Sequence, residues 1–500
     1  MRIPDKHKLA RIILGVFLAV ASSGSILTFV VLALCRISYP FELEWMEGGT
    51  VDHVVRILDG KLLYAKPSLD FVAYIYTPLY FYVSAAVSAL LGVGFLPMRI
   101  VSLSSALGSF AVIFLLVGRE TRSWLAGLVA SGLFAATYEL SGSWLDIARV
   151  DSLYLFLMLI AAYLIRFNQS VKGYVLAGVF ASLAFLTKQA ALAVCLPMML
   201  GACALNWRLS IILAATFAAI VGGSTLVLDH IHDGWYTYYV FYLPRQHELI
   251  PEMLIQFWTK DLLVHLPIAC LLGAFFLVRS LVKGDRRVAV FYLFLTVGMV
   301  GSAWLGRLHH GGHLNVLIPG LAMISVLVGL VMAPFFSGLN RGKRLIPYLV
   351  VAACLVQFVL LKYDPARFIP DEKDLAAGNG FIQMVSQIEG EVLIPYHGYL
   401  SALAGKKSYA HKMALGDVVR GDDSLGVALF YEEIEPRIRK NEFAAIILDA
   451  SWYEETVKSH YSYIGSPIST PNAFYPVTGY RTRPEYLFVP SESPAVAPSD

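Results

Sequence analysis

The chain has 500 residues, of which 57% are hydrophobic and 15% are charged, and its mean hydropathy is +0.64. This composition is typical of a protein with many membrane-spanning helices and excludes a soluble globular protein. The formal net charge of +3 is too small to indicate a nucleic-acid partner. The five cysteines lie in or beside apolar segments, which argues against a disulfide framework.

The N-terminal segment MRIPDKHKLAR is basic and leads into a long apolar run. This run is longer than the core of a typical signal peptide and lacks a convincing cleavage site, so we interpret it as an uncleaved membrane anchor. Similar apolar segments recur along the chain and are long enough to cross a bilayer. They predict a polytopic α-helical membrane protein with about eleven transmembrane helices, at residues 11–35, 97–118, 123–140, 152–166, 173–187, 189–205, 209–228, 261–279, 288–304, 314–335 and 345–361.

One further apolar segment, 76–94, decides the side of every later loop. If it stays at the surface, the basic clusters at 119–122, 279–287 and 341–344 share the side of the basic N-terminal tail, as the positive-inside rule requires. Its aromatic start, YIYTPLYFY, suits a juxtamembrane helix at the interface. We therefore predict a multi-pass protein of the cell membrane with a cytoplasmic N-terminus and an extracytoplasmic C-terminal domain.

The unusual polar residues gather in the predicted outer regions 36–96, 141–151, 229–260 and 305–315, and Lys188 reaches the same side. The inner loops are short and simply basic. This asymmetry indicates that chemistry or binding takes place at the outer face.

From Lys362 onwards the composition becomes more polar. Helical patterns at 374–389 and 426–440 alternate with short apolar runs at 391–397 and 444–450 that read as buried strands. Such alternation predicts a small α/β domain, which we expect to be non-catalytic and to help hold an acceptor. The predicted organisation is a membrane domain, a small extracytoplasmic α/β domain and a disordered Pro/Ser-rich tail, at residues 1–361, 362–490 and 491–500.

Several motifs resemble those of the GT-C membrane glycosyltransferases, in particular the protein O-mannosyltransferase and aminoarabinose transferase branches. They are an acidic first outer loop, a G-x-x-L-Y motif, YTPLY, the Arg-initiated span MRIVSLSSALGS and the Asp of ARVDSLYLFL. The resemblance covers about residues 10–335. It implies a GT-C fold and the transfer of a sugar from a polyprenyl-phosphate donor to a lipid, glycan or protein acceptor at the outer face.

Three carboxylates, Glu42, Glu44 and Glu47, lie within six residues of the first outer loop. Acids beside a membrane cost free energy unless they have a function, and nearby apolar surface raises a carboxyl pKa towards that of a useful general base. Glu44 lies where the resemblance implies the catalytic acid, Glu47 follows one helical turn later, and which of the two is the base stays open. Asp151 is the second predicted acid. The alternatives without a function are a solvated loop and, for Asp151, a helix cap.

The leaving group of the implied reaction is a lipid phosphate, and a nearby cation would stabilise the negative charge that develops on it. Lys188 sits between two apolar runs, where an unpaired Lys is expensive, and we expect it to contact the phosphate rather than merely to snorkel. The HHxxH pattern could offer imidazoles to a divalent metal, so a metal cofactor stays open. The remaining predicted donor-phosphate ligands are Arg307, His309, His310 and His313, and further candidate site residues are Asp146, Arg149, Arg99 and Tyr76.

Two other classes of protein compete with an enzyme. A transporter or flippase of a lipid-linked substrate would place polar residues at the membrane midplane, often in broken helices of inverted repeats. A membrane scaffold would need no clustered acids. The ionisable residues here lie at predicted outer helix ends and no repeat is visible, which favours the glycosyltransferase.

Overall fold

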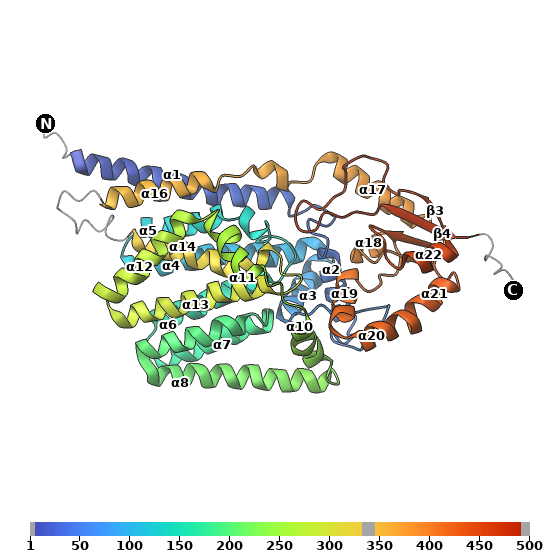
Figure 1. Ribbon diagram of the computed structural model, residues 1–500, viewed down its shortest axis with the longest axis horizontal. Helices are drawn as coiled ribbons and strands as arrows, with labels where there is room; N and C mark the ends of the chain where they lie inside the picture. Colours follow the sequence, from blue (N-terminus) through green and yellow to red (C-terminus); the bar gives the residue numbers. More distant parts are fainter. Residues whose placement is uncertain (1–5, 333–345, 492–500) are drawn as a thin grey trace.

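The computed structural model describes residues 6–332 and 346–491. The predictions for the extreme basic N-terminus, for the basic loop at 341–344 and for the tail beyond residue 491 lie outside these residues. A bundle of long helices forms one end of the molecule, and a mixed helix and sheet domain forms the other (Figure 1). Helix α1 (Lys6–Arg36) begins at the end of the bundle that is remote from this domain (Figure 1).

The helical bundle is built from segments whose side chains are almost wholly apolar. Ser123 and Ser170 cap the starts of α5 and α7 by accepting hydrogen bonds from backbone N–H groups, which fixes where those helices begin. The elements of the first half are α2 (Glu47–Leu58), α3 (Leu79–Leu91), α4 (Phe95–Thr121), α5 (Trp124–Ala136), η1 (Glu139–Ser141), α6 (Asp151–Phe167), α7 (Val171–Thr187) and α8 (Ala191–Ile231).

After α8 the chain forms several short helices, and longer helices of the bundle follow them. Asp285 caps the start of α13 with its side chain. These elements are α9 (Trp235–Thr237), η2 (Tyr238–Tyr242), α10 (Leu243–Gln246), α11 (Met253–Gln256), η3 (Phe257–Leu263), α12 (Pro267–Lys283), α13 (Arg286–Leu308), η4 (Leu314–Leu317), α14 (Ile318–Val331) and α16 (Ile346–Leu360).

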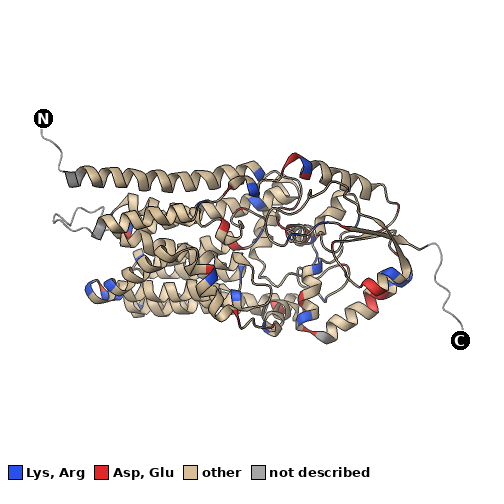
Figure 2. Ribbon diagram, turned by 45° about the horizontal axis from the view of Figure 1, so that its top comes forward, with Lys and Arg blue, Asp and Glu red and all other residues tan. Residues whose placement is uncertain are grey.

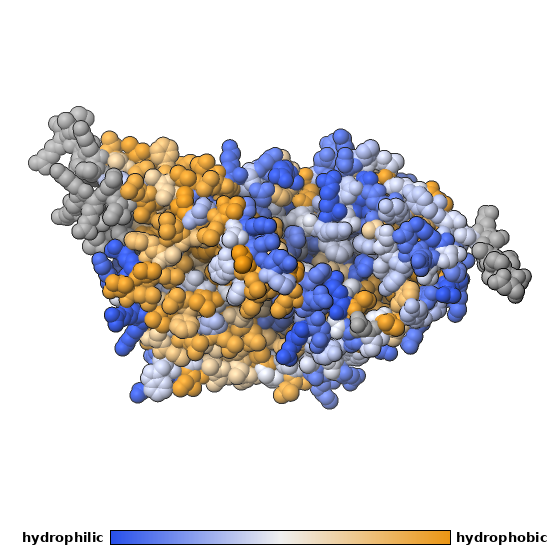
Figure 3. All heavy atoms as spheres, viewed as in Figure 1, coloured by the Kyte–Doolittle hydropathy of each residue, from blue (hydrophilic) through white to orange (hydrophobic). Residues whose placement is uncertain are grey.

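The surface of the bundle is hydrophobic over most of the face shown in Figure 3, whereas the C-terminal end is hydrophilic. Large apolar side chains such as Val20, Leu200 and Leu271 are more than half exposed there. In water these side chains would cost free energy, but in a bilayer they face lipid. The bundle is therefore the membrane-embedded part of the chain.

The described residues contain five helices that are long and apolar enough to cross a membrane, or up to seven if each of two bent helix pairs is one span. Helices α5, α6 and α7 occupy predicted spans but have 13, 17 and 17 residues. A perpendicular crossing needs about twenty residues, so the expected total of about eleven spans stays a prediction. Asn206 has non-helical backbone angles inside α8, and the predicted spans 189–205 and 209–228 lie on either side of it.

Helix α3 has 13 residues, fewer than a crossing needs, as expected for a helix at the membrane interface. Together with α2 (Glu47–Leu58) it fills the segment between α1 and α4, where juxtamembrane helices were predicted. The first two turns of α2 are mostly buried, including Glu47 and His53, so this loop is an integral part of the core and is not solvated.

The C-terminal region contains a four-stranded sheet with the strand order β1-β2-β4-β3. The predicted strands correspond to β1 and β2, which pair in parallel, whereas β4 pairs antiparallel with both β2 and β3. Its elements are η5 (Pro365–Phe368), α17 (Glu372–Ser386), β1 (Val392–Leu393), α18 (Gly398–Leu403), α19 (Lys412–Gly421), α20 (Asp423–Ala428), η6 (Leu429–Ile434), α21 (Glu435–Arg439), β2 (Ala445–Leu448), α22 (Glu454–His460), β3 (Tyr461–Gly465) and β4 (Tyr486–Pro490). Asp371 and Asp374 form a capping box that starts α17.

Candidate functional site

A cavity of about 340 Å³ lies between the helical bundle and the C-terminal region. Charged residues are frequent in the segments at this level of the molecule and are sparse along the bundle helices (Figure 2). The wall comes from several parts of the chain that are remote in sequence. It is lined by residues 44–46 and 74–76, by Trp144, Arg149, Lys188, Pro244 and His247, by Gly306, 309–313, Asn315 and Val316, and by Met413, Asp417, Gly479 and Tyr480.

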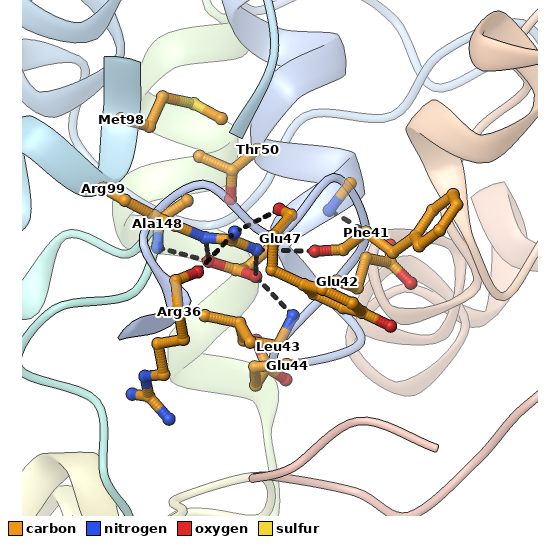
Figure 4. A network of polar contacts seen from close by, with 12 residues as sticks. Arg36, Phe41, Glu42, Leu43, Glu44, Glu47, Thr50, Met98, Arg99 and Ala148 are labelled. Carbon is orange, nitrogen blue, oxygen red and sulfur yellow. Dashed lines mark hydrogen bonds and ion pairs between the residues drawn. The ribbon is translucent and has the colours of Figure 1, made fainter. Parts of the chain in front are cut away.

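The acidic loop enters this wall because a buried ion pair fixes its shape. Arg99, in the first turns of α4, donates two hydrogen bonds to Glu47, of 3.0 and 2.7 Å, and reaches the carbonyl oxygens of Tyr39 and Phe41 (Figure 4). Glu47 also accepts bonds from the backbone N–H groups of Leu43 and Ala148. Every carboxylate oxygen of Glu47 is therefore occupied, and its side chain is fully buried.

Glu44 occupies a different environment, although it lies three residues away in the same loop. Its side chain is buried and lines the cavity, but neither carboxylate oxygen accepts a hydrogen bond of ordinary geometry from the described part of the chain. Burial raises the pKa of this carboxyl to about 8; the charge of Arg149 opposes the shift, and the charges of Glu47 and Glu42 add to it. A buried carboxylate with free oxygens can accept a proton from a molecule in the cavity.

Arg149 is the cation nearest to Glu44. Its Nη1 lies 3.6 Å from Glu44 Oε2 and has no hydrogen-bond partner among the described residues. The guanidinium lies over the ring of Trp144 at 4.9 Å and donates a 3.0 Å hydrogen bond to the hydroxyl of Tyr76. These contacts hold the group rigidly at the wall while one of its donors stays available.

Lys188 ends α7 and lines the same cavity. Its Nζ forms a buried 2.6 Å ion pair with Asp151, at the start of α6, and Asn315 donates a 3.0 Å hydrogen bond to the same carboxylate oxygen. The second oxygen of Asp151 has no partner among the described residues. The structure thus brings the predicted cation and the second predicted acid together as one pair.

The histidine turn 309–313 forms another part of the cavity wall. Burial lowers the pKa of both His309 and His313, and neighbouring cations lower that of His313 further, so these imidazoles offer hydrogen bonds rather than charge. His313 stacks on Trp144. No group of three or more His, Cys, Asp or Glu side chains within 6–332 and 346–491 could hold a metal ion.

Some predicted site residues lie behind the cavity wall instead of lining it. Arg307 pairs with Asp261 at 2.7 Å, and Asp146 pairs with the buried Arg36 at the same distance. Arg36 was not singled out in the sequence because it reads as the ordinary residue that follows the apolar span 11–35. The predicted residues that do line the cavity are Glu44, Tyr76, Arg149, Lys188, His309, His310 and His313, and those that do not are Glu47, Arg99, Asp146, Asp151 and Arg307.

The C-terminal region supplies wall residues that the sequence did not reveal. Met413 and Asp417 come from α19, and Gly479 and Tyr480 come from a loop before β4. Asp417 is buried and pairs with Arg420 at 2.5 Å, and burial raises the pKa of its carboxyl. No motif marks these positions, because only the docking of the two parts brings them to the cavity.

The sequence and the fold are similar to those of several known proteins. Residues 76–230 match the model of a family described as dolichyl-phosphate-mannose-protein mannosyltransferase, and no curated protein matches the sequence significantly. ArnT from Cupriavidus metallidurans, solved with bound undecaprenyl phosphate, is 11% identical with a TM-score of 0.58, over 95% of this chain and 99% of that chain. The Archaeoglobus fulgidus oligosaccharyltransferase, solved with Zn and sulfate, is also 11% identical with a TM-score of 0.52, over 91% of this chain and 72% of that chain.

The oligosaccharyltransferase AglB from Archaeoglobus fulgidus, in complex with an inhibitory peptide and a dolichol-phosphate, gives a TM-score of 0.50 at 11% identity, over 94% of this chain and 76% of that chain. At these identities the likeness concerns the fold. The chain is an integral membrane protein with the fold of the GT-C membrane glycosyltransferases, the superfamily that its sequence motifs resemble.

Proposed function

We propose that the protein is a glycosyltransferase that moves a sugar from a polyprenyl-phosphate donor to a hydroxyl or amine acceptor at the outer face of the membrane, with Glu44 as the general base. The observation that carries the proposal is the carboxylate of Glu44, which is buried, borders the cavity and has no hydrogen-bond partner in the described chain. A buried carboxylate without a protein partner costs about 1–3 kcal/mol unless a molecule in the cavity completes its hydrogen bonds, and a bound acceptor can take that place.

The reaction follows from the groups that face the cavity. The acceptor loses its proton to Glu44 as its oxygen or nitrogen forms a bond to the anomeric carbon of the sugar. The bond between that carbon and the phosphate oxygen breaks, and the phosphate leaves with the electron pair. Arg149 and Lys188 border the same cavity and stabilise the negative charge that grows on the phosphate.

The comparisons support a lipid-linked donor. ArnT was solved with undecaprenyl phosphate and AglB with a dolichol-phosphate, and both share the fold. In this chain the cavity lies at the end of the apolar bundle, so a phosphate could enter it while the polyprenyl chain stays in lipid. The same location disfavours a transporter, which needs its polar site near the membrane midplane.

The remaining groups have supporting roles in this proposal. Asp151 holds Lys188, whereas His309, His310 and His313 offer hydrogen bonds to donor or acceptor oxygens. Tyr76 and Trp144 orient Arg149. Glu47 and Arg99 fix the shape of the loop that carries Glu44.

The proposal is tested with the purified full-length protein in lipid nanodiscs. Undecaprenyl-phosphate-linked hexoses and pentoses are offered as donors, and membranes of a strain that lacks the protein serve as the acceptor source. We expect one donor to release undecaprenyl phosphate while its sugar appears on an acceptor, and we expect Glu44→Gln to lose this transfer. A panel in which no donor is consumed by the wild type, or a fully active Glu44→Gln, would overturn the proposal.

A further inference from the structure

The C-terminal region contacts every residue from Glu42 to Trp45. His397 bonds the carboxylate of Glu42, and the backbone N–H of Thr478 donates to the carbonyl oxygen of Leu43 at 3.1 Å. The imidazole of His411 donates to the carbonyl oxygen of Trp45 at 3.2 Å. Because these contacts come from three separate parts of the C-terminal region, they fix the loop from several directions at once.

The side chain of Glu44 lies directly against Gly479. Gly479 has a φ of 77°, and a Cβ at that position would lie 2.7 Å from Cγ of Glu44. Only glycine combines this backbone conformation with such a close approach. The loop before β4 is therefore shaped to the side chain of the proposed base.

The strongest of these contacts is a chain of three ionisable side chains. His397 Nδ1 lies 2.5 Å from Glu42 Oε2, and Nε2 lies 2.8 Å from Asp449 Oδ2. The hydroxyl of Thr482 donates to the same Asp449 oxygen at 2.5 Å. All three charged side chains are buried, and Glu42 also accepts a bond from the backbone N–H of Gly48, so it is tied to both ends of the acidic loop.

The sheet explains why His397 stands at this place. His397 lies just beyond β1, Asp449 lies just beyond β2, and the two strands are parallel neighbours. The carboxyl ends of parallel strands meet at one edge of the sheet, which is where α/β folds present their functional groups. This edge faces the acidic loop instead of solvent.

The charge of the imidazole is set by its two partners. Burial alone would lower its pKa, but the carboxylates of Asp449 and Glu42 together raise the pKa of His397 to about 10. His397 is thus an imidazolium that donates from both ring nitrogens. Removal of one partner would leave a buried charge without compensation.

We infer that His397 is a positioning residue for the sugar transfer: it holds Glu42, and through Glu42 it holds the loop that presents Glu44 to the cavity. The inference rests on the proposed function of Glu44. His397 does not line the cavity, so it acts through the loop and touches no substrate. The C-terminal region then belongs to the catalytic apparatus, in contrast to the non-catalytic role that its sequence suggested.

Displacement of a general base by about 1 Å is enough to cost on the order of 10²-fold in rate. Two variants separate positioning from general stability. In His397→Asn the amide nitrogen takes the place of Nδ1 and keeps the bond to Glu42. In His397→Gln the amide nitrogen takes the place of Nε2 and keeps the bond to Asp449 while Glu42 is released.

We expect His397→Gln to lower kcat per folded molecule by about 10- to 100-fold with little change in KM for the donor, and His397→Asn to retain most of the activity. The matched control is Tyr461→Phe, which removes the two buried hydrogen bonds between the Tyr461 hydroxyl and the backbone of Phe443 inside the C-terminal region but does not touch the acidic loop. It should leave kcat unchanged. A merely structural role for His397 predicts equal kcat per folded molecule for both His397 variants, and that result would overturn the inference.

Hydrogen–deuterium exchange provides a readout that does not require turnover. We expect faster exchange of residues 42–47 in His397→Gln than in the wild type, and unchanged exchange in Tyr461→Phe. If the wild type transfers no sugar, the proposed function fails, but the exchange measurement still tests whether His397 holds the acidic loop in place. If neither His397 variant folds, Glu42→Ala decides, because it removes the bonds that Glu42 accepts from His397 and from Gly48. A wild-type kcat in that variant would refute the positioning role.

Discussion

Glu44 and Arg149 face each other at 3.6 Å in the wall of the cavity, and each keeps a polar atom that has no hydrogen-bond partner in the described chain. Buried charges of opposite sign usually approach to hydrogen-bonding distance, because a full pairing offsets the cost of leaving water. This pair stays apart since Arg149 is held by Trp144 and Tyr76, and Glu44 by its loop. The geometry leaves an acid and a cation open towards the same space, as a reaction that takes up a proton and releases an anion requires.

The first prediction concerns the base itself. Glu44→Gln keeps the size and the hydrogen bonding of the side chain but removes its basicity, so folding should survive and transfer should fall by roughly 10²–10⁴-fold. Glu47→Gln serves as the comparison: Glu47 does not border the cavity but fixes the shape of the loop that carries Glu44, so its loss should lower stability and should reduce transfer less than Glu44→Gln does. Normal transfer by Glu44→Gln together with an inactive, folded Glu47→Gln would move the base to Glu47.

The second prediction is the pH dependence of the wild type. Burial raises the pKa of Glu44 to about 8, so at neutral pH the carboxyl is largely protonated and cannot accept a proton. The value of kcat/KM should therefore rise about tenfold per pH unit below pH 8 and level off above it. Initial rates between pH 6 and 9.5 in detergent or nanodiscs measure this, and a rate that falls across the range would contradict the assignment.

The third prediction concerns the effect of Arg149 on the pH dependence of kcat/KM. The positive charge of Arg149 lowers the pKa of Glu44 and so opposes the effect of burial. Arg149→Gln should shift the rising limb of kcat/KM to higher pH and weaken the binding of undecaprenyl phosphate. Lys61→Gln, at an exposed cation that pairs with Asp59, provides the control and should change neither quantity. An unshifted limb in Arg149→Gln would show that another group sets the profile.

The fourth prediction concerns the pair of Lys188 and Asp151. Lys188→Ala should lower donor binding and turnover without loss of folding, since removal of a cation that stabilises developing charge costs roughly 10²-fold or more in rate. Asp151→Asn keeps the shape but frees Lys188 from its partner, so its effect on donor affinity reports whether the pair acts as a unit. Titration of undecaprenyl phosphate into each purified variant gives the affinities. Wild-type turnover in well-folded Lys188→Ala would remove Lys188 from the site.

The fifth prediction separates scaffold from chemistry. Arg99 holds Glu47 and two carbonyl oxygens in the buried loop, and Arg99→Met would leave Glu47 as an unpaired buried charge. The protein should lose about 3–5 kcal/mol of stability. The exposed pair of Lys61 and Asp59 should contribute at most about 1 kcal/mol when Lys61 is replaced by Met. Thermal unfolding in detergent measures both, and equal losses would refute the distinction.

The sequence by itself determined the class of the protein and most of its local structure. Apolar runs predicted where helices such as α4 and α13 lie, because burial in lipid or in a core is dictated by nearby residues. The two apolar runs near 391–397 and 444–450 likewise predicted β1 and β2. The acidic loop stood out because carboxylates at a membrane surface are costly. Each of these signals comes from residues that are close together in the chain.

Only the tertiary structure decided which acid is free to react. Glu42, Glu44 and Glu47 look alike in the sequence, yet Glu47 is neutralised by Arg99, 52 positions away, and Glu42 by His397, 355 positions away. Glu44 is left with one cation at 3.6 Å and with open oxygens. Ion pairs between residues that are remote in sequence depend on how the helices and the C-terminal region dock, and no local sequence pattern encodes that docking. The role proposed for His397 could therefore be inferred only from the folded structure.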